Sequence, residues 1–338
     1  MFKTAEMVSL GHPDKIADYI SSYILDRLIE QDRNLKYAVE VMVKDNTVVL
    51  GGEVTGNVDL ANVTEYVKSA LREIGYDERY ASIWGDYAIN INKINVINLI
   101  GVQSPDINCG VANDGWGDQG VFVGYACRGT DLINRELYLA RKLNRAIYDM
   151  ARESDNLGLD IKTQITIDNQ GNIDTAIVAV PMLTPVDLTH TVIGVLGQTP
   201  NKIIINGTGI YRYHSSIADC GVTGRKLACD FYSTASPIGG GAPWTKDASK
   251  ADLTLNLFAR HLAIENLGDN DECFVYLSSC IGRSELPCGR IKTIKAGIVS
   301  ETNLHCIYPP RILIKLFGLN QPVFCKLCRD GITQRILT

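Results

Sequence analysis

The sequence has no apolar run that approaches the roughly 20 residues needed to cross a bilayer. It also begins without the apolar segment typical of a secretory signal. Charge of one sign is not in large excess, because the formal net charge is only -5. Such a balance gives no global attraction to nucleic acid or to an anionic membrane, so any anion site must be locally basic. These absences predict a cytoplasmic protein with no nucleic-acid partner and no membrane partner.

Disulfides are not expected, although the chain has ten cysteines, because the cysteines are scattered and no secretory signal precedes them. Cys325 and Cys328 form a lone CxxC pair, and His305 with Cys306 would be needed to complete a zinc site. Only the CxxC pair has metal-ligand spacing, since adjacent histidine and cysteine residues chelate one ion poorly. We therefore favour buried or half-exposed thiols over a structural zinc.

Two common nucleotide-binding motifs are missing as well. The Walker A spacing, in which Gly-Lys-Ser/Thr closes a phosphate loop, does not occur. Residues Gly115–Gly120 satisfy GxGxxG on paper, but a loop precedes them and a strand-like run, Val121–Cys127, follows. A dinucleotide fingerprint needs a strand before the glycines and a helix after them, so we reject a Rossmann site.

What the chain does contain is a repeated succession of apolar strands and amphipathic helices. Its 338 residues, of which 46% are apolar, are enough for two or three domains with a sizeable core. Residue periodicity predicts helices over 13–32, 63–74, 135–152 and 250–266. Apolar runs bounded by turn residues predict strands over 37–44, 47–55, 94–101, 121–127, 162–168, 173–180, 202–206, 273–281 and 290–296. Units of paired strands and a helix thus recur about three times, without a visible sequence repeat.

The triple-glycine stretch Gly239–Asp252 is the first candidate for a polyphosphate site. Its glycines let a ligand approach backbone N–H groups, Lys246 and Lys250 supply positive charge, and Asp252 is available for a metal. Taken alone, the stretch fits better with a glycine-rich loop that leads into a solvated helix. Other segments decide between these interpretations.

Two of those segments place further charge where phosphate would bind. The first helix opens at Gly11–Lys15, so His12 and Asp14 lie near the positive end of its dipole. By itself, Asp14 would be only a first-turn helix stabiliser. Asp219–Lys226 places an acid and two bases in a glycine-punctuated loop. The Gly-, Asn- and Asp-rich stretch 103–117 predicts a mobile loop, a common form of active-site lid.

Together, these segments resemble those of the S-adenosylmethionine synthetases, also called methionine adenosyltransferases. The resembling motifs cover nearly the whole chain and keep the family's order and spacing. They are Gly11–Lys15 (GHPDK), Gly51–Glu53 (GGE), Arg72–Tyr76 (REIGY), Gln103–Asn108 (QSPDIN), Gly117–Gly120 (GDQG), Asp219–Lys226 (DCGVTGRK) and Gly239–Asp252.

The resemblance implies an α+β fold of three similar α/β subdomains with mixed sheets around a pseudo-threefold axis. One subdomain would combine residues 1–12 with 120–205, a second would span 13–119 with the mobile loop 104–117, and a third would span 206–338. It also implies sheets that pack across a dimer interface, in a homodimer or a dimer of dimers with shared active sites.

The implied reaction is the synthesis of S-adenosylmethionine from ATP and L-methionine. The methionine sulfur attacks C5′ of ATP in an SN2 step, and the released tripolyphosphate is hydrolysed to pyrophosphate and phosphate. By resemblance, the catalytic residues are His12, Lys162, Arg225 and Lys246. The matching ATP-binding positions are His12, Asp160, Lys162, Tyr211, Asp219, Arg225, Lys226, Ala242 and Lys246. The matching methionine-binding positions are Glu53, Gln103, Asp118, Asp219, Lys250 and Ile281. Asp14 and Asp252 match ligands of Mg²⁺, with two ions per site, and Glu40 matches a ligand of K⁺.

Some positions depart from the family's pattern. Ile210 replaces an arginine, Trp116 stands where a small residue is usual, and 243–245 reads Pro-Trp-Thr in place of Phe-Ser-Gly. The charged groups of the chemistry are retained, so the synthetase is the favoured interpretation. The alternatives are a catalytically silent ATP-binding relative with a regulatory role, and a phosphotransferase that uses the same polyphosphate site.

Overall fold

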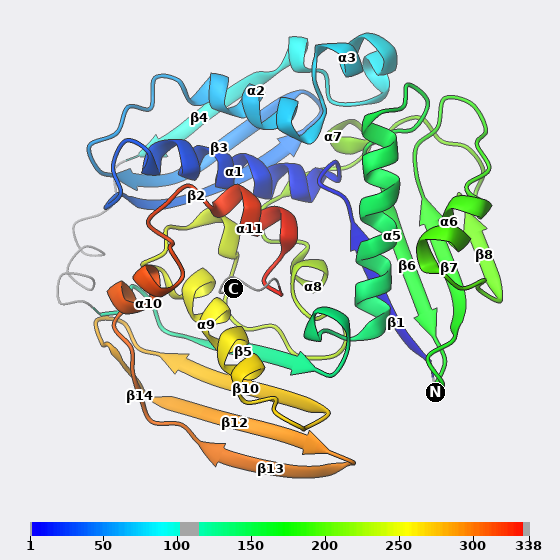
Figure 1. Ribbon diagram of the computed structural model, residues 1–338. Coiled ribbons are helices and arrows are strands. Elements are labelled where there is room, and N and C mark those ends of the chain that lie inside the picture. Colours follow the sequence, from blue (N-terminus) through cyan, green and yellow to red (C-terminus); the bar gives the residue numbers. More distant parts are fainter. Residues whose placement is uncertain (1, 102–114, 334–338) are drawn as a thin grey trace.

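The computed structural model describes residues 2–101 and 115–333 of the chain. Three four-stranded sheets lie around the outside of the molecule, and helices α1, α5 and α9 lie on their inner faces (Figure 1). Almost all buried apolar side chains belong to one continuous core that all three sheets share. Loops that connect the sheets to α1, α5 and α9 therefore meet near the centre of the molecule.

The first sheet has the strand order β4-β3-β2-β9. Its strands are β2 (Lys36–Lys44), β3 (Thr47–Thr55), β4 (Asn95–Gly101) and β9 (Gly221–Val222). The predicted hairpin between β2 and β3 is confirmed, and β4 pairs with β3 in parallel. The helix α1 (Pro13–Ile29) packs on it, and α2 (Val63–Ile74) packs beside α1. The sheet is mixed, and its short strand β9 comes from a segment more than a hundred residues away in the chain.

The second sheet has the order β1-β6-β7-β8 and is also mixed. Its strands are β1 (Lys3–Val8), β6 (Lys162–Ile167), β7 (Ile173–Ala179) and β8 (Lys202–Ile205). The helices α5 (Arg135–Arg152) and α6 (Thr189–Leu196) belong to the same part of the fold. The N-terminal strand β1 thus pairs with β6 from the middle of the chain.

The third sheet has the order β13-β12-β10-β5 and is antiparallel throughout. Its strands are β5 (Gly120–Cys127), β10 (Glu272–Ser279), β12 (Cys288–Lys295) and β13 (Ile298–Asn303), and α9 (Ala251–Glu265) packs on β5 and β10. In the predicted division, 120–127 belonged with the N-terminal strand, but β5 pairs with β10 instead. The division into three parts at the predicted boundaries otherwise stays a prediction.

Shorter elements connect the three sheets. The helices are α3 (Glu78–Trp84), α7 (Ser215–Ala218), α8 (Leu227–Asp230), α10 (Pro310–Leu316) and α11 (Phe324–Asp330), and the 3₁₀ turns are η1 (Gly85–Tyr87), η2 (Ile91–Lys93), η3 (Thr130–Leu132) and η4 (Pro243–Thr245). A two-stranded ribbon pairs β11 (Glu285–Leu286) with β14 (Cys306–Ile307). Over the described ranges, no helix combines the length and the apolar character needed to cross a membrane.

Helix α1 shows why sequence periodicity found the helices but not their roles. Its apolar residues at four-residue spacing are buried, as predicted, and it ends at Ile29 rather than near Asp32. However, Lys15 and Asp18 are buried as completely as the isoleucines. Charged side chains are almost never buried unless they are paired, so this end of α1 must lie in a network of charges.

The described cysteine side chains are all free thiols, and several of them are buried. Cys328 is fully buried and Cys325 is partly buried. No group of three or more potential metal ligands occurs in the described parts of the chain. Both CxxC thiols are thus buried or half-exposed, as expected from the sequence.

Candidate active site

The N-terminus of α1 is the centre of the candidate site. His12 is the N-cap residue, and its Nδ1 accepts a hydrogen bond of 3.1 Å from the backbone N–H of Asp14. Pro13 occupies the first helical turn, where its lack of an N–H costs nothing. Both His12 and Asp14 are buried, so the helix presents its first charged groups to the interior.

The loop that ends at Lys226 closes onto this helix end. Asp14 accepts hydrogen bonds from the backbone N–H of Val222 (2.9 Å) and from Lys226 Nζ (2.6 Å). Arg225 Nε lies 3.6 Å from Asp14 Oδ1. The approach requires glycine at 221, because a Cβ there would lie 2.1 Å from the carbonyl oxygen of Pro13. Two separate motifs of the sequence thus meet at one carboxylate.

The Gly-rich loop forms a second carboxylate–lysine pair. Lys246 Nζ donates to Asp252 Oδ2 at 2.5 Å, and the N–H of Gly241 donates to Asp252 Oδ1 at 2.7 Å. At Gly240, whose φ is +75°, a Cβ would lie 2.9 Å from Asp252 Oδ1. The loop therefore folds back on the start of α9.

The two pairs belong to one neighbourhood. Gly224 has φ +74°, and a Cβ at that position would lie 2.7 Å from the Cβ of Ala242. The loop 219–226 therefore touches the Gly-rich loop directly. This contact connects the surroundings of Asp14 to the surroundings of Lys246.

Leu159 and Asp160 form a fourth segment beside the site, and Asp160 is one of the predicted nucleoside contacts. Gly11 packs closely against this segment, because a Cβ at Gly11 would lie 2.2 Å from the carbonyl oxygen of Leu159. Asp160 Oδ2 accepts a hydrogen bond of 3.0 Å from the N–H of Ser215. Burial raises the pKa of Asp160 to about 6, and its Oδ1 is buried without a hydrogen-bond partner. The same carboxylate contributes, after burial, to the raised pKa of Tyr211, so the aromatic ring and the acid are neighbours.

His12 is neutral in this environment. Burial, first, and then the positive charges of Lys226 and Lys162 together lower the pKa of His12 from 6.5 to about 3. Since Nδ1 accepts a hydrogen bond, the neutral imidazole carries its proton on Nε2. The ring is thus a hydrogen-bond donor that remains uncharged at neutral pH.

The predicted methionine-binding residues are not joined in the same way. Glu53 is half-buried on β3, whereas Asp118 is exposed and lies beside β10, where Ser279 donates to its carbonyl oxygen. Ile281 is 50% exposed and bridges to Trp116, and Lys250 is buried at the start of α9. Gln103 and most of the predicted lid lie outside the described residues. Within the described ranges, no side-chain hydrogen bond or ion pair joins these residues to one another.

The metal positions can be tested by the chemistry of their donors. Asp14 and Asp252 supply carboxylate oxygens, each already facing a lysine, and neither belongs to a ready-made group of three protein ligands in the described chain. This fits Mg²⁺, which typically takes one or two carboxylates and completes its shell with substrate phosphate and water. Glu40 accepts hydrogen bonds from the hydroxyls of Thr223 and Thr245. The three side chains form an oxygen-only set, which is the donor type suited to K⁺.

Sequence reasoning missed a buried network behind these residues. Lys15, Asp18, Asp230 and Trp244 are all nearly inaccessible to solvent, and Lys15 contacts both carboxylates. Lys15 was singled out only as part of a motif, and Trp244 only as a departure from the family. The available signal was the position of Lys15 and Asp18 in a helix turn that leads into an apolar face.

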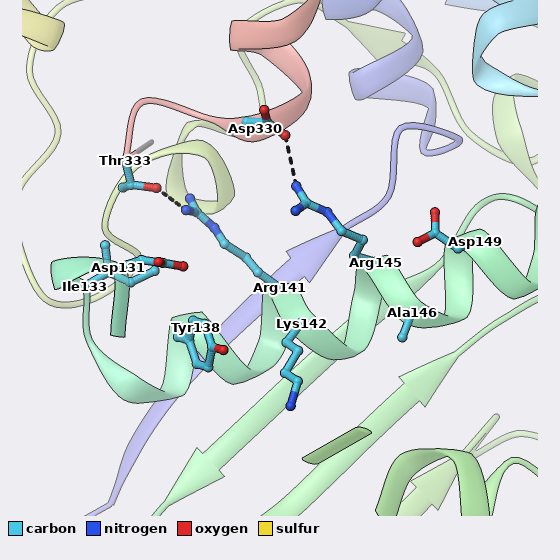
Figure 2. Close-up of a pocket in the computed structure, with 10 residues that line it drawn as sticks. All are labelled: Asp131, Ile133, Tyr138, Arg141, Lys142, Arg145, Ala146, Asp149, Asp330 and Thr333. Carbon is cyan, nitrogen blue, oxygen red and sulfur yellow. Dashed lines mark hydrogen bonds and ion pairs between the residues drawn. The ribbon is translucent and has the colours of Figure 1, made fainter. Parts of the chain in front are cut away.

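A cavity of the described structure lies away from this site. Figure 2 shows it between α5 and the C-terminal segment. Its volume is about 650 Å³. Residues that line it include Tyr138, Arg141, Lys142, Arg145, Asp330 and Thr333. Arg145 and Asp330 form an ion pair of 2.9 Å across it. None of the predicted site residues lines this cavity, so its size does not make it the active site.

Comparisons with known proteins agree with the arrangement. Sequence models of the S-adenosylmethionine synthetase N-terminal, central and C-terminal domains match residues 1–105, 113–208 and 213–336. An S-adenosylmethionine synthase of Chlorobium phaeobacteroides is 34% identical, over 95% of this chain and 89% of its own length. In structure, the chain is similar to an unusual S-adenosylmethionine synthetase from Campylobacter jejuni. The TM-score is 0.86 at 31% identity, and the match covers 98% of this chain and 94% of the other. The expected three-part α+β fold is thereby confirmed.

Proposed function

The chain belongs to the S-adenosylmethionine synthetase family, and from that premise we propose how its residues carry out the reaction. The reaction is the synthesis of S-adenosylmethionine from ATP and L-methionine. A C–S bond forms at C5′ of ATP as the C5′–O bond breaks, and the bonding electron pair leaves with tripolyphosphate. Hydrolysis of the tripolyphosphate then gives pyrophosphate and phosphate.

The chemistry explains the kind of residues that gather at the site. A thioether sulfur attacks without losing a proton, so the step needs no general base. Catalysis must instead come from positioning the two substrates and from stabilising the negative charge that grows on the leaving oxygen. A site built of lysines, an arginine and a neutral histidine suits that demand.

We assign His12 to the leaving oxygen. Its Nδ1 is occupied by the N–H of Asp14, so the proton on Nε2 is free to be donated. Because the ring is neutral, it adds a hydrogen bond without competing for the charges that hold the phosphates. Lys162, Arg225, Lys226 and Lys246 supply those charges, and Ala242 offers backbone contact.

The nucleoside and methionine ends use different groups. Asp160, Tyr211 and Asp219 are assigned to the nucleoside, where the tyrosine ring stacks on adenine. Glu53, Gln103, Asp118, Asp219, Lys250 and Ile281 are assigned to methionine. In this set, carboxylates meet the ammonium group and Lys250 meets the carboxylate.

Asp14 and Asp252 would hold two Mg²⁺ ions per site, and Glu40 would hold K⁺. When bound, these ions supply positive charge against the polyphosphate. Lys226 and Lys246 already hold the two carboxylates in place at 2.6 and 2.5 Å. They would exchange part of that contact for substrate phosphate oxygens.

We further propose a homodimer with active sites shared between subunits, in the cytoplasm. Large apolar side chains on the strands of the first and third sheets support it: Met42, Ile97, Leu99 and Val121 are 43%, 42%, 64% and 58% exposed. Met42 and Ile97 are both paired in register with Val49, and clustered exposed apolar side chains of this kind mark association sites. A second subunit would also supply the enclosure that Glu53 and Asp118 lack. A dimer of dimers is the larger assembly that the same surfaces allow.

The proposed function rests chiefly on one observation. His12, Asp14 and Lys226 lie together beside the Lys246–Asp252 pair. The test is a product assay with ATP, L-methionine, Mg²⁺ and K⁺. We expect S-adenosylmethionine, pyrophosphate and phosphate in equal amounts. Bound ATP without product would indicate the silent relative, and ADP among the products would indicate a phosphotransferase.

A further inference from the structure

Three segments that carry phosphate-side residues meet at one buried carboxylate, that of Asp230. Lys15 Nζ donates to Asp230 Oδ1 at 2.9 Å and to Oδ2 at 2.8 Å. Trp244 Nε1 donates to the same Oδ2 at 2.8 Å. All three side chains are at most 1% exposed, so these bonds are shielded from water. We call the three residues the Asp230 junction.

Each residue of the Asp230 junction adjoins a different part of the site. Lys15 follows Asp14 on α1, and Asp230 ends α8, the short helix that begins directly after Lys226. Trp244 lies in η4, between Ala242 and Lys246. The junction therefore sets how the helix end, the loop 219–226 and the Gly-rich loop lie relative to one another.

Further contacts hold Lys15 and Trp244 in place at the junction. Lys15 Nζ lies 5.3 Å from the centre of the Trp244 ring and 3.3 Å from Asp18 Oδ2. Asp18 Oδ1 accepts from the N–H of Gly224 at 2.8 Å. Ser22 Oγ donates to the carbonyl oxygen of Trp244 at 3.2 Å. The indole is thus fixed at its ring nitrogen, its ring face and its backbone.

The carboxylate of Asp230 makes the indole N–H more than a packing contact. A hydrogen bond to a buried charge is stronger than one between neutral groups, and losing it leaves that charge less well compensated. The ammonium group of Lys15 can rotate and donate in several directions. The indole of Trp244 is rigid, and its N–H donates in one direction only. The Trp244 bond therefore ties the Gly-rich loop to Asp230 in one direction, in addition to the bonds of Gly241 and Lys246 to Asp252.

We propose that Trp244 is a positioning residue of the phosphate side, acting through Asp230 to align Lys246 with His12 and Asp14. The proposal rests on the function proposed above. It also gives a role to a departure from the family pattern, because Trp244 stands where the resembling motif has serine. The indole touches no substrate in this role.

The test is Trp244→Phe, which keeps an aromatic ring and removes the donor. We expect the KM for ATP to rise about fivefold to tenfold, the scale of one hydrogen bond to a charged group, with the KM for methionine unchanged. The affinity of the free protein for tripolyphosphate should fall by the same factor. A merely structural role would change both KM values or neither.

Trp84→Phe is the matched control. Trp84 is 1% exposed, and its Nε1 has no hydrogen-bond partner among the described residues. The substitution removes the same atoms from a buried indole without breaking a hydrogen bond to a carboxylate. It should leave the affinity for tripolyphosphate at the wild-type value, and an equal loss in both variants would overturn the proposal.

A second variant guards against misfolding of Trp244→Phe. Replacing Trp244 with 3-benzothienylalanine keeps both rings and substitutes sulfur for the N–H. The same loss of tripolyphosphate affinity is expected, and wild-type affinity would overturn the proposal. If wild-type protein binds tripolyphosphate but forms no S-adenosylmethionine, the proposed function fails while the junction is still tested by binding alone.

Discussion

The phosphate side and the methionine side of the site are built differently. On the phosphate side, Asp14 and its neighbours are buried and joined by bonds between segments far apart in sequence. On the methionine side, Asp118 is exposed and Glu53 only half-buried. Clustered positive charges repel one another unless carboxylates hold them, so the phosphate side must be assembled in advance. The methionine side handles one small ligand, and its enclosure can be completed by the substrate and a second subunit.

The strongest way to break this contrast is to remove a charge from the phosphate side. Lys246→Met should lower kcat/KM for ATP by about a hundredfold to a thousandfold, the scale of one lost contact to developing charge. The KM for methionine should stay near the wild-type value. Initial rates of S-adenosylmethionine formation over both substrate concentrations measure this.

Lys142→Met is the control for that variant, because Lys142 is exposed on α5 beside the distant cavity. It should retain wild-type rates. If Lys246→Met raised the KM for methionine and left kcat/KM for ATP unchanged, the assignment of Lys246 to the phosphate side would be wrong.

A smaller effect is expected on the methionine side. Glu53→Gln removes a charge proposed to face the methionine ammonium group and should raise the KM for methionine about tenfold to thirtyfold. The affinity for tripolyphosphate should not change, since Glu53 has no part in the buried network.

Glu65→Gln provides the comparison for Glu53. Glu65 forms an exposed ion pair of 2.7 Å with Arg72, and such surface pairs contribute little. It should behave as wild type in both measurements. If Glu53→Gln instead weakens tripolyphosphate binding, the two sides are not separate.

The proposed dimer can be used to sharpen the contrast. Leu99 is 64% exposed on β4, and Leu99→Lys would place a charge on the apolar strand face. We expect subunit dissociation to become at least about tenfold easier, from the transfer energy of one large side chain. The KM for methionine should then rise as the protein is diluted, while tripolyphosphate still binds.

Ile312→Lys tests the same change away from these sheets. Ile312 is 48% exposed on the helix α10, which belongs to neither the first nor the third sheet. Sedimentation of both variants separates the outcomes. Equal dissociation in both would remove Leu99 from the interface.

The smallest expected effect is on pH dependence. In the folded protein the pKa of His12 is lowered from 6.5 to about 3 by burial and by neighbouring lysines. As the pH falls through 6.5, the unfolded state therefore binds the proton first. Because of His12, the free energy of unfolding falls progressively as the pH is lowered from 6.5 to about 3. Above pH 6.5, His12 causes no such loss.

His12→Gln should accordingly have a flatter profile of unfolding free energy between pH 6.5 and 5, measured by urea denaturation. In the wild-type NMR spectrum, the His12 ring should not titrate between pH 8 and 5. An apparent His12 pKa near 6.5 in the free protein would contradict the buried, neutral ring.

The sequence was sufficient for much of this architecture and for the identity of the charged residues. Periodicity located α1, α5 and the β2–β3 hairpin because their apolar faces pack on one core. It missed α3 and β13, since the first is short and the second is exposed on both faces. Pairing of β5 with β10 was not predictable, because a strand's partner far along the chain leaves no local pattern.

For the site, motif resemblance supplied the roles, and only the structure supplied the contacts. The bonds of Val222 and Lys226 to Asp14 join residues about two hundred positions apart. The burial of Asp230 could not be read from its sequence neighbours. Charge networks depend on which segments meet, and that is decided by the packing of the whole core.

Amide hydrogen exchange tests the central claim most directly. The N–H groups of Val222, Gly224 and Gly241 donate to buried or half-buried carboxylates, whereas residues 117–119 and 280–283 lie on the open methionine side. We predict that the first three are protected in the free protein and change little when a non-hydrolysable ATP analogue and methionine are added. Asp118 and Ile281 should gain protection only then, whereas the N–H groups of Gly282 and Arg283 already donate to the carbonyl oxygens of Trp116 and Cys280 in the free protein. Immediate exchange at Val222, Gly224 and Gly241 in the free protein would contradict a phosphate side that is assembled before substrate binds.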